Sequence, residues 1–158
     1  MSKKLPIEVV HEVRDCCLCL ATQRAARTLA RRFDRAFAPL RLTNGQFSLM
    51  MSLNAPQPPT LGRLAQALAM DRTTLTAALK SLERRGLVET RFDEKDRRAR
   101  RLFLTHAGGD LLAAALPIWR KEHGALDAGF SQSEGQKLRK ALRKLGAETQ
   151  TEGKDVKA

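Results

Sequence analysis

The sequence contains none of the short motifs that usually mark a catalytic site. It has no glycine-rich phosphate loop, no nucleophile elbow and no paired-acid site. His106 and His123 have no carboxylate or cysteine at a spacing that would signal catalysis. We therefore expect that the protein is not an enzyme, and the sequence predicts no cofactor.

Segments that direct a protein into a membrane are also missing. Residues 1–15 hold no apolar stretch with a small-residue cleavage site, and no uncharged apolar run approaches the roughly 18 residues of a membrane span. The three cysteines, Cys16, Cys17 and Cys19, are clustered within one helical turn, which is not the pattern of a disulfide framework. These absences predict a soluble, cytoplasmic protein with no membrane partner.

Acidic residues are few compared with basic ones. The chain of 158 residues, long enough for one domain with a real core, has 29 Lys and Arg against 17 Asp and Glu, a net charge of +12. A bias of this size favours a polyanionic partner such as nucleic acid or an anionic membrane surface. Composition alone does not choose between these two partners.

Glycine is absent between residues 7 and 38, and the only proline after Pro6 in this part of the chain is Pro39. This predicts one long helix. Residues 16–21 are apolar on every side of that helix, which suggests burial on two sides, against its own core and against another chain. We therefore predict that the helix takes part in a homodimer.

Capping signals predict three short helices in the middle of the chain. Thr43 and Gln46 form a capping box for a helix through about Leu53, and Thr60 caps a helix over residues 61–69.

Asp71 then caps a helix that runs to Arg85, and Gly86 stands where a helix end needs a positive φ. The second and third of these helices are amphipathic and are separated only by a tight turn.

A charged hairpin follows this pair of helices. Residues 87–92 and 101–104 are predicted to form its two strands, with residues 93–100 at the tip. Between Arg91 and Arg101 the sequence places six basic and three acidic side chains. So much charge in a short hairpin needs a functional explanation.

The remainder of the chain is predicted to be helical. Thr105 caps a helix that extends to Gly129 and is interrupted by Pro117. A last helix ends near Leu145, and the polar residues 146–158 are expected to form a flexible tail.

This order of elements predicts a mainly α fold with a small β-hairpin wing, a winged helix-turn-helix. In such a domain the second helix of the pair enters the major groove, where its first turns read base edges while flanking cations hold phosphates. The last turn, with Arg84 and Arg85, is expected at the DNA backbone. The predicted DNA contacts of helix 71–85 are Arg72, Thr73, Thr74, Thr76, Ala77, Lys80, Ser81 and Arg84.

Three stretches resemble the MarR family of bacterial dimeric transcription regulators: DRTTLTAALKSLERRGLV at 71–88, DEKDRR at 93–98 and LFLT at 102–105. The resemblance covers residues 10–145. It implies that Asp96 holds Arg98 and that Arg98 enters the minor groove, because a cation already oriented by a carboxylate loses less entropy on binding. The wing residues predicted to act in DNA binding are Lys95, Asp96, Arg97, Arg98 and Arg100.

The resemblance also implies a division of the chain. Residues 43–105 would bind DNA, residues 7–42 and 106–145 would form the helical dimerisation region, and 146–158 the tail. A dimer of this kind is most often a repressor. It places its two DNA-binding domains, one reading head from each copy, about 34 Å apart on a pseudo-palindromic operator. The alternative is an architectural or non-specific nucleic-acid-binding protein, whose affinity would depend on salt and ignore sequence.

The cysteines offer one way to control such a regulator. Cys16 lies near the peroxide-sensing thiol of the OhrR branch of the family, although the tyrosines that support that thiolate are absent and a helix N-terminus or Arg14 would have to replace them. Two alternatives stay open. Cys16, Cys17 and Cys19 are small apolar core residues, or Cys16 and Cys19 bind a soft metal with His11.

A stripe of arginines offers another way to control such a regulator. Arg24, Arg27, Arg31 and Arg35 recur at spacings of three and four on one face of the first helix. They form either a solvated surface or the lining of a pocket for a small anionic or aromatic effector near the dimer interface, for which the candidates are Arg24, Arg27 and Arg31.

Overall fold

The structure, a computed structural model, describes residues 4–93 and 100–152. It is mainly helical with a two-stranded antiparallel hairpin, as predicted. The elements follow in the order α1 (Ile7–Cys16), α2 (Leu18–Phe37), the 3-10 turn η1 (Ala38–Leu40), α3 (Asn44–Leu53), α4 (Leu61–Ala67), α5 (Arg72–Arg84), β1 (Val88–Phe92), β2 (Arg100–Leu104), α6 (His106–Asp127) and α7 (Gln132–Glu152).

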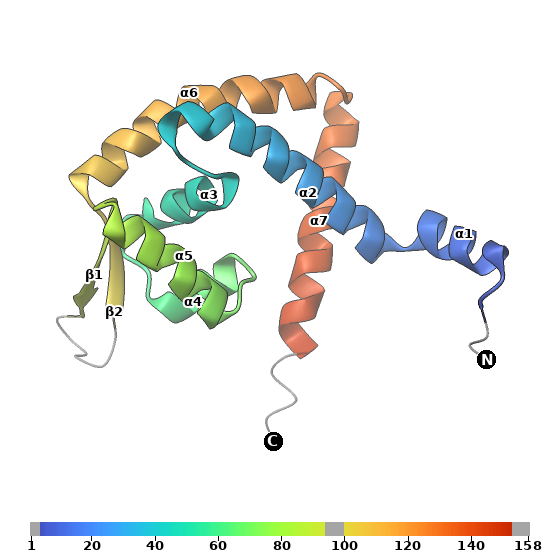
Figure 1. Ribbon diagram of the computed structural model, residues 1–158, viewed down its shortest axis with the longest axis horizontal. Helices are drawn as coiled ribbons and strands as arrows, with labels where there is room; N and C mark the ends of the chain where they lie inside the picture. Colours follow the sequence, from blue (N-terminus) through green and yellow to red (C-terminus); the bar gives the residue numbers. More distant parts are fainter. Residues whose placement is uncertain (1–3, 94–99, 153–158) are drawn as a thin grey trace.

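The long helices α2 and α6 lie side by side and form one layer above the shorter helices (Figure 1). Helices α3, α4 and α5 lie below them, and the hairpin hangs from one end of α6. Helix α7 descends from the other end of α6, and α1 extends away from the rest of the chain.

The predicted single helix over residues 7–38 is wrong, because the chain breaks at Cys17. This residue is extended, with φ −77° and ψ 104°, and its Sγ accepts the backbone N–H of Leu20 at 3.4 Å. The sulfur thus satisfies one of the donors that an α-helix leaves without a partner in its first turn. The predicted burial against the chain's own core is also wrong, since Leu18 is 67% exposed.

The core is built around a row of aromatic rings that joins three helices. The ring of Phe37 stacks on that of Phe47 at 4.9 Å between centroids, with Phe33 on one side and Trp119 on the other. The other buried hydrophobic residues come from α3, α4, α5, the two strands, α6 and the adjoining loops: Leu42, Leu49, Met50, Leu53, Leu64, Ala65, Leu75, Leu79, Leu82, Leu87, Val88, Leu102, Leu112 and Ala115.

The predicted caps are confirmed. Thr43 and Gln46 form a complete capping box at α3, and the side chains of Thr60, Asp71 and Thr105 accept a backbone N–H in the first turn of α4, α5 and α6. Each of these contacts is local in sequence, so the residues that form the cap also determine where the helix begins.

Each of the two turns around α5 contains one residue in the left-handed backbone conformation. Gly86 has φ +67° directly after this helix, as predicted. Ala69 has φ +49° in the turn after α4, which ends at Ala67 rather than at the expected residue 69. The N–H of Met70 then bonds to the carbonyl of Ala65 at 2.9 Å, which closes the helix end and leads directly into α5.

The hairpin pairs Val88 with Leu104 and Phe92 with Arg100. A third segment joins it, because Leu102 donates its N–H to the carbonyl of Pro59 at 3.1 Å, just before α4 begins. The hairpin and the α4–α5 pair are therefore connected through backbone as well as side chains.

Two predictions for the C-terminal helices need correction. Helix α6 continues through Pro117. The proline removes only one backbone hydrogen bond, and the buried side chains of Leu112 and Ala115 hold the helix against the core. Helix α7 continues through Glu152 rather than ending near Leu145. Residues 153–158 of the expected tail lie outside the described part of the chain.

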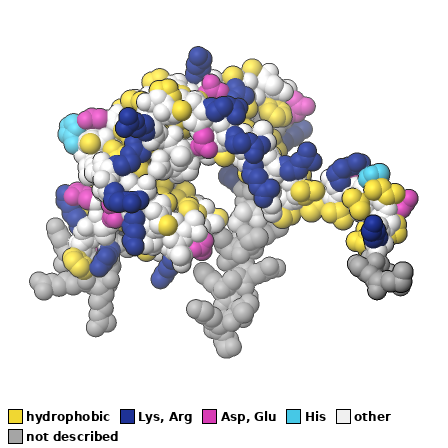
Figure 2. Space-filling model, in the orientation of Figure 1, with side chains coloured by type: hydrophobic (Ala, Val, Ile, Leu, Met, Phe, Trp, Pro, Cys, Tyr) yellow, Lys and Arg dark blue, Asp and Glu magenta, His cyan; other side chains and the backbone are white. Residues whose placement is uncertain are grey.

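Two helix surfaces expose rows of large hydrophobic side chains. They comprise Ile7, Val10 and Val13 on α1 and Leu138, Leu142 and Leu145 on α7. Figure 2 shows hydrophobic side chains crowded over α1 at the right of the molecule. Within the described ranges, no helix is both long and apolar enough to cross a membrane.

Two neighbouring glycines at the start of α6 should respond in opposite ways to alanine. A Cβ on Gly108 would lie 2.1 Å from the carbonyl oxygen of Leu87, whereas a Cβ on Gly109 meets nothing within 4 Å. We expect Gly108→Ala to lower the free energy of unfolding by about 1–3 kcal/mol, as for overpacked sites, and Gly109→Ala to raise it by roughly 0.5–1 kcal/mol. Urea denaturation of the two variants tests this, and equal effects would contradict the close approach at Gly108.

Candidate nucleic-acid interface

The exposed face of α5 brings most of the predicted reading residues together. Leu75, Leu79 and Leu82 hold the opposite face of the helix in the core. The exposed face forms a shallow hollow of about 380 Å³, lined by Arg72, Thr73, Thr76, Ala77 and Lys80. Of the other predicted contacts on this helix, Arg84 is exposed and Ser81 is partly buried.

Two hydroxyl groups on this helix already have acceptors inside the chain. Thr74 donates its Oγ1 proton to Asp71 at 2.6 Å, and its N–H bonds to the same carboxylate at 2.8 Å. These bonds, the hydroxyl first, hold the pKa of Asp71 below its ordinary value. Thr76 donates to the carbonyl of Arg72 at 2.6 Å. Both threonines therefore offer methyl groups and oxygen acceptors, rather than hydroxyl protons, to a partner.

Arg72, Thr73 and Lys80 are in the opposite situation. Among the described residues, their side chains make no hydrogen bond or ion pair. The Arg72 guanidinium lies over Gly62 of α4, where a Cβ would meet it at 3.4 Å, so a larger residue there would crowd it. These three side chains are donors that α5 can direct outward.

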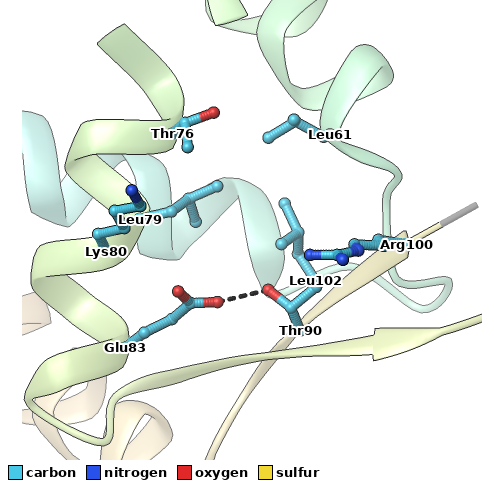
Figure 3. A pocket seen from close by; sticks show the side chains of 8 residues that line it. All are labelled: Leu61, Thr76, Leu79, Lys80, Glu83, Thr90, Arg100 and Leu102. Atoms are coloured by element: carbon cyan, nitrogen blue, oxygen red, sulfur yellow. Dashed lines mark hydrogen bonds between the residues drawn. The ribbon is translucent and has the colours of Figure 1, made fainter. Parts of the chain in front are cut away.

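A groove of about 180 Å³ separates α5 from the hairpin (Figure 3). Lys80 from α5 and Arg100 from β2 line it from opposite sides. Thr90 of β1 donates its hydroxyl proton to the carboxylate of Glu83 across one end of the groove. Two cations thus face one groove, while the acid beside them is held by a hydrogen bond.

A buried carboxylate holds the hairpin where its strands lead into the tip. Asp93 is only 7% exposed and forms an ion pair with Nε of Arg101, whose Nη1 also donates to the carbonyl of Pro58 at 2.8 Å. Arg101 therefore ties β2 to the loop before α4. Sequence reasoning missed this role because it treated the hairpin charges as one group, and a partner 43 residues away leaves no local signal.

Cation–π contacts orient two further arginines of the hairpin. Arg100 lies 5.4 Å from the centroid of the Phe92 ring, and Arg91 lies 5.0 Å from that of Phe103. Since Phe92 is 65% exposed, the stacked Arg100 stays at the surface. The other predicted wing residues, Lys95, Asp96, Arg97 and Arg98, lie outside the described residues, and their roles remain predictions.

The two arginines that end α5 differ in their surroundings. Arg84 is exposed, and within residues 4–93 and 100–152 it has no hydrogen-bond or ion-pair partner. Arg85, also expected at the DNA backbone, instead donates to the carbonyl of Arg41 at 2.8 Å. Its guanidinium is therefore engaged with the turn that follows α2.

The cysteines occupy three different environments. Cys16 is exposed at the end of α1, Cys17 is half-buried at the start of α2, and Cys19 accepts a hydrogen bond from Gln23 at 3.2 Å. Arg14, considered as support for a Cys16 thiolate, is instead bound to Asp15 by two bonds of 2.7 Å, which lower the pKa of that carboxyl.

None of the three cysteines is a core residue within a single chain. Over the described ranges, no group of three or more His, Cys, Asp and Glu residues is placed to hold a metal ion.

The predicted effector arginines lie along an exposed face of α2. Arg27 donates to Gln23 at 3.0 Å and Arg31 to Thr28 at 3.3 Å, while Arg24 is exposed. An open hollow of about 480 Å³ lies farther along the helix. It is lined by Arg32, Arg35, Ala36 and Glu122, with a 2.7 Å ion pair between Arg32 and Glu122.

Both histidines considered in the sequence contact an aspartate four residues later. His106 contacts Asp110 at 2.9 Å, and His123 contacts Asp127 at 3.3 Å. Each pair spans four residues of one helix, the spacing at which side chains are neighbours on a helix surface. The second pair connects helices, because Arg139 of α7 also binds Asp127 and is the main cause of that carboxyl's lowered pKa.

Known proteins share this architecture. Residues 42–99 match the model of the MarR family. The M. tuberculosis transcriptional regulator MosR, in a crystal structure with DNA, is 34% identical, with a TM-score of 0.77 over 85% of this chain and 97% of MosR. The transcriptional repressor CouR bound to a 23-mer DNA duplex is 28% identical, with a TM-score of 0.76 over 90% and 99% of the two chains.

A more distant structure shares the fold. It is the S. aureus MepR–DNA complex, which is 22% identical to this chain, with a TM-score of 0.74 over 83% of this chain and 97% of MepR.

The ion pair between Asp93 and Arg101 predicts unequal effects for two adjacent arginines. Arg101→Ala leaves the buried Asp93 carboxylate without this partner, and we expect it to lower the free energy of unfolding by about 1–3 kcal/mol. Arg100→Ala removes an exposed cation–π contact and should cost less than about 1 kcal/mol. Urea denaturation provides the comparison, and a smaller effect at Arg101 than at Arg100 would contradict the assignment.

Proposed function

The chain belongs to the MarR family, and from that premise we propose that it is a homodimeric repressor that binds a pseudo-palindromic DNA site and releases it on a chemical signal. As a member of this family it is a DNA-binding transcription regulator. The observation that carries the proposal is the exposed face of α5, where Arg72, Thr73 and Lys80 are directed outward beside the cationic hairpin.

In the proposed complex, α5 enters the major groove. Arg72 in the first turn donates to a guanine edge or to a phosphate, and the methyl groups of Thr74 and Thr76 contact thymine methyls. Lys80 and Arg100 hold phosphate on either side of the groove between α5 and the hairpin. For the wing tip we keep the proposal from the family resemblance, in which Asp96 orients Arg98 in the minor groove.

The exposed apolar rows support a homodimer. Ile7, Val10 and Val13 on α1, like the leucines on α7, lie on surfaces that no part of the described chain covers. Large exposed apolar surfaces of this kind mark protein interfaces. We propose that residues 7–42 and 106–145 form the dimerisation region around a DNA-binding domain at 43–105.

The cysteine cluster supports thiol oxidation as the signal, with Cys17 rather than Cys16 as the reacting residue. The sulfur of Cys17 accepts an N–H in the first turn of α2, and the N-terminus of a helix stabilises negative charge on sulfur. Cys16 lies at the opposite, C-terminal end of α1. Peroxide would convert a Cys17 thiolate to a sulfenic acid, with transfer of one oxygen atom and release of hydroxide.

A small anionic or aromatic effector is the alternative signal. Arg24, Arg27 and Arg31 remain its proposed partners, and the hollow at Arg35 lies on the same helix. A carboxylate entering there would compete with Glu122 for Arg32. This competition would loosen the contact between α2 and α6.

Selection from random DNA should separate reading from backbone contacts. We expect the parent to select one palindrome, Arg72→Ala to alter the selected bases in each half, and Arg84→Ala to keep the parent's consensus while weakening every site about equally. An unchanged consensus for Arg72→Ala would remove Arg72 from the reading residues. A parent protein that selects no sequence and binds only according to salt would be an architectural protein instead.

Peroxide treatment should release the parent protein from its selected site, whereas Cys17→Ser should stay bound because no sulfenic acid can form at the start of α2. Cys16→Ser and Cys19→Ser serve as matched controls on either side of Cys17. DNA retention is measured by fluorescence anisotropy, and oxidation by mass spectrometry. Retention of DNA by a parent protein that is fully oxidised at Cys17 would favour the effector over the thiol.

A further inference from the structure

The last turn of α5 is fastened to the end of α2 through one guanidinium. Nη1 of Arg85 donates to the carbonyl of Arg41 at 2.8 Å, and Nη2 makes a longer contact of 3.5 Å with the carbonyl of Leu40. These contacts span more than 40 residues of sequence and connect two separate layers of the fold.

The turn that receives Arg85 has an unusual backbone. Arg41 adopts a left-handed conformation, φ 51° and ψ 39°, directly after the 3-10 turn that contains Pro39. Outside glycine this conformation costs about 1–2 kcal/mol and persists where surrounding contacts determine it. Carbonyl oxygens at a helix C-terminus also carry partial negative charge, so a cation is favoured there. Arg85 thus acts as a C-terminal cap supplied from another helix.

The same end of α5 is fastened to α6 as well. Thr105 donates its hydroxyl proton to the carbonyl of Gly86 at 2.6 Å and its N–H to the carbonyl of Leu87 at 3.2 Å. Gly108 approaches the Leu87 carbonyl so closely that no Cβ fits between them. Within three residues after α5, the chain therefore contacts both long helices.

We infer that Arg85 is a positioning residue, which fixes the direction of α5 relative to α2 and thereby sets the spacing of half-sites that a dimer accepts. The inference rests on the proposed function, since it requires a dimer with one reading head per half-site. Without the Arg85 contacts, α5 would be held at this end only through Gly86 and Leu87, and a small change in its direction would move its N-terminal end, where the bases are read. Fixing this direction before binding lowers the entropy lost when both heads dock together.

Binding to full and half operators tests this role. The probes are the palindrome selected by the parent protein, the same palindrome with one or two base pairs inserted at its centre, and a duplex with one intact half-site. The proteins are the parent, Arg85→Ala, Arg85→Lys and the matched control Arg84→Ala, each first checked for folding by circular dichroism and urea denaturation.

We expect Arg85→Ala to bind the full palindrome roughly tenfold more weakly, the effect of losing about 1.4 kcal/mol, and to bind the half-site duplex like the parent. Its penalty for inserted base pairs should also shrink. Arg84→Ala should weaken full and half sites together. Arg85→Lys keeps the charge but not the planar fork that spans two carbonyls, so its tolerance of spacing should resemble that of Arg85→Ala.

Other results would overturn the inference. If Arg85→Ala weakens the half-site as much as the full site, and Arg85→Lys restores both, Arg85 is a phosphate contact. If Arg85→Ala keeps the parent's spacing preference, the guanidinium does not position α5. A parent protein that does not prefer the palindrome over a half-site would contradict the proposed function itself, which is a distinct result from either of these.

Discussion

The stacking of Phe37 on Phe47 is the contact on which the position of the reading head depends. Phe37 is fully buried at the end of α2, and Phe47 lies one turn into α3. Trp119 continues the row into α6. Such pairs contribute about 0.5–1.5 kcal/mol beyond their buried area, yet their larger effect is geometric. They join α3 to the layer of long helices, so the packing of these rings sets the frame to which the contacts of Arg85 and Thr105 attach α5.

Three carboxylates near the candidate interface, among the residues that the structure describes, are engaged within the chain. Asp71 accepts two bonds from Thr74, Glu83 accepts one from Thr90, and Asp93 pairs with Arg101. A free acid facing DNA would oppose binding, whereas an acid held by a donor stabilises a cap or orients a cation. This arrangement resolves the mixture of charges in the hairpin. Of its described arginines, Arg101 is held in an ion pair with Asp93, whereas Arg100 stays at the surface, in a chain whose net charge is +12.

Sequence reasoning succeeded where the determining contacts are local. The caps at Thr43, Thr60, Asp71 and Thr105 act within three residues of themselves, so composition and spacing were enough to predict where α3 to α6 begin. The caps and the hairpin pattern together predicted the fold class, and they predicted which residues lie together on the exposed face of α5.

The features that sequence reasoning missed depend on distant or unusual partners. Arg85 and Arg101 look like their neighbours Arg84 and Arg100 until the fold brings a carbonyl more than 40 residues away against them. Pro117 is a helix breaker by propensity, yet packing against the core outweighs its lost hydrogen bond. The break at Cys17 has no glycine or proline to announce it, since its stabilising group is a cysteine sulfur in a capping role that oxygen usually fills.

Cys17 and the turn bound by Arg85 lie at opposite ends of α2. This helix of 20 residues spans about 30 Å, and it is buried only in its second half, at Phe33 and Phe37. Its first half emerges from the core toward the surfaces that we propose a second copy covers. A chemical change at Cys17 would therefore act on how two copies meet, while the packing that holds α5 stays intact. It follows that oxidation, under this proposal, would leave the half-site preference of each head unchanged and would remove only the advantage of binding with two heads. Such a switch would need no change within the DNA-reading helix, because in the proposed dimer the distance between heads would also depend on the angle at which α2 meets the second copy.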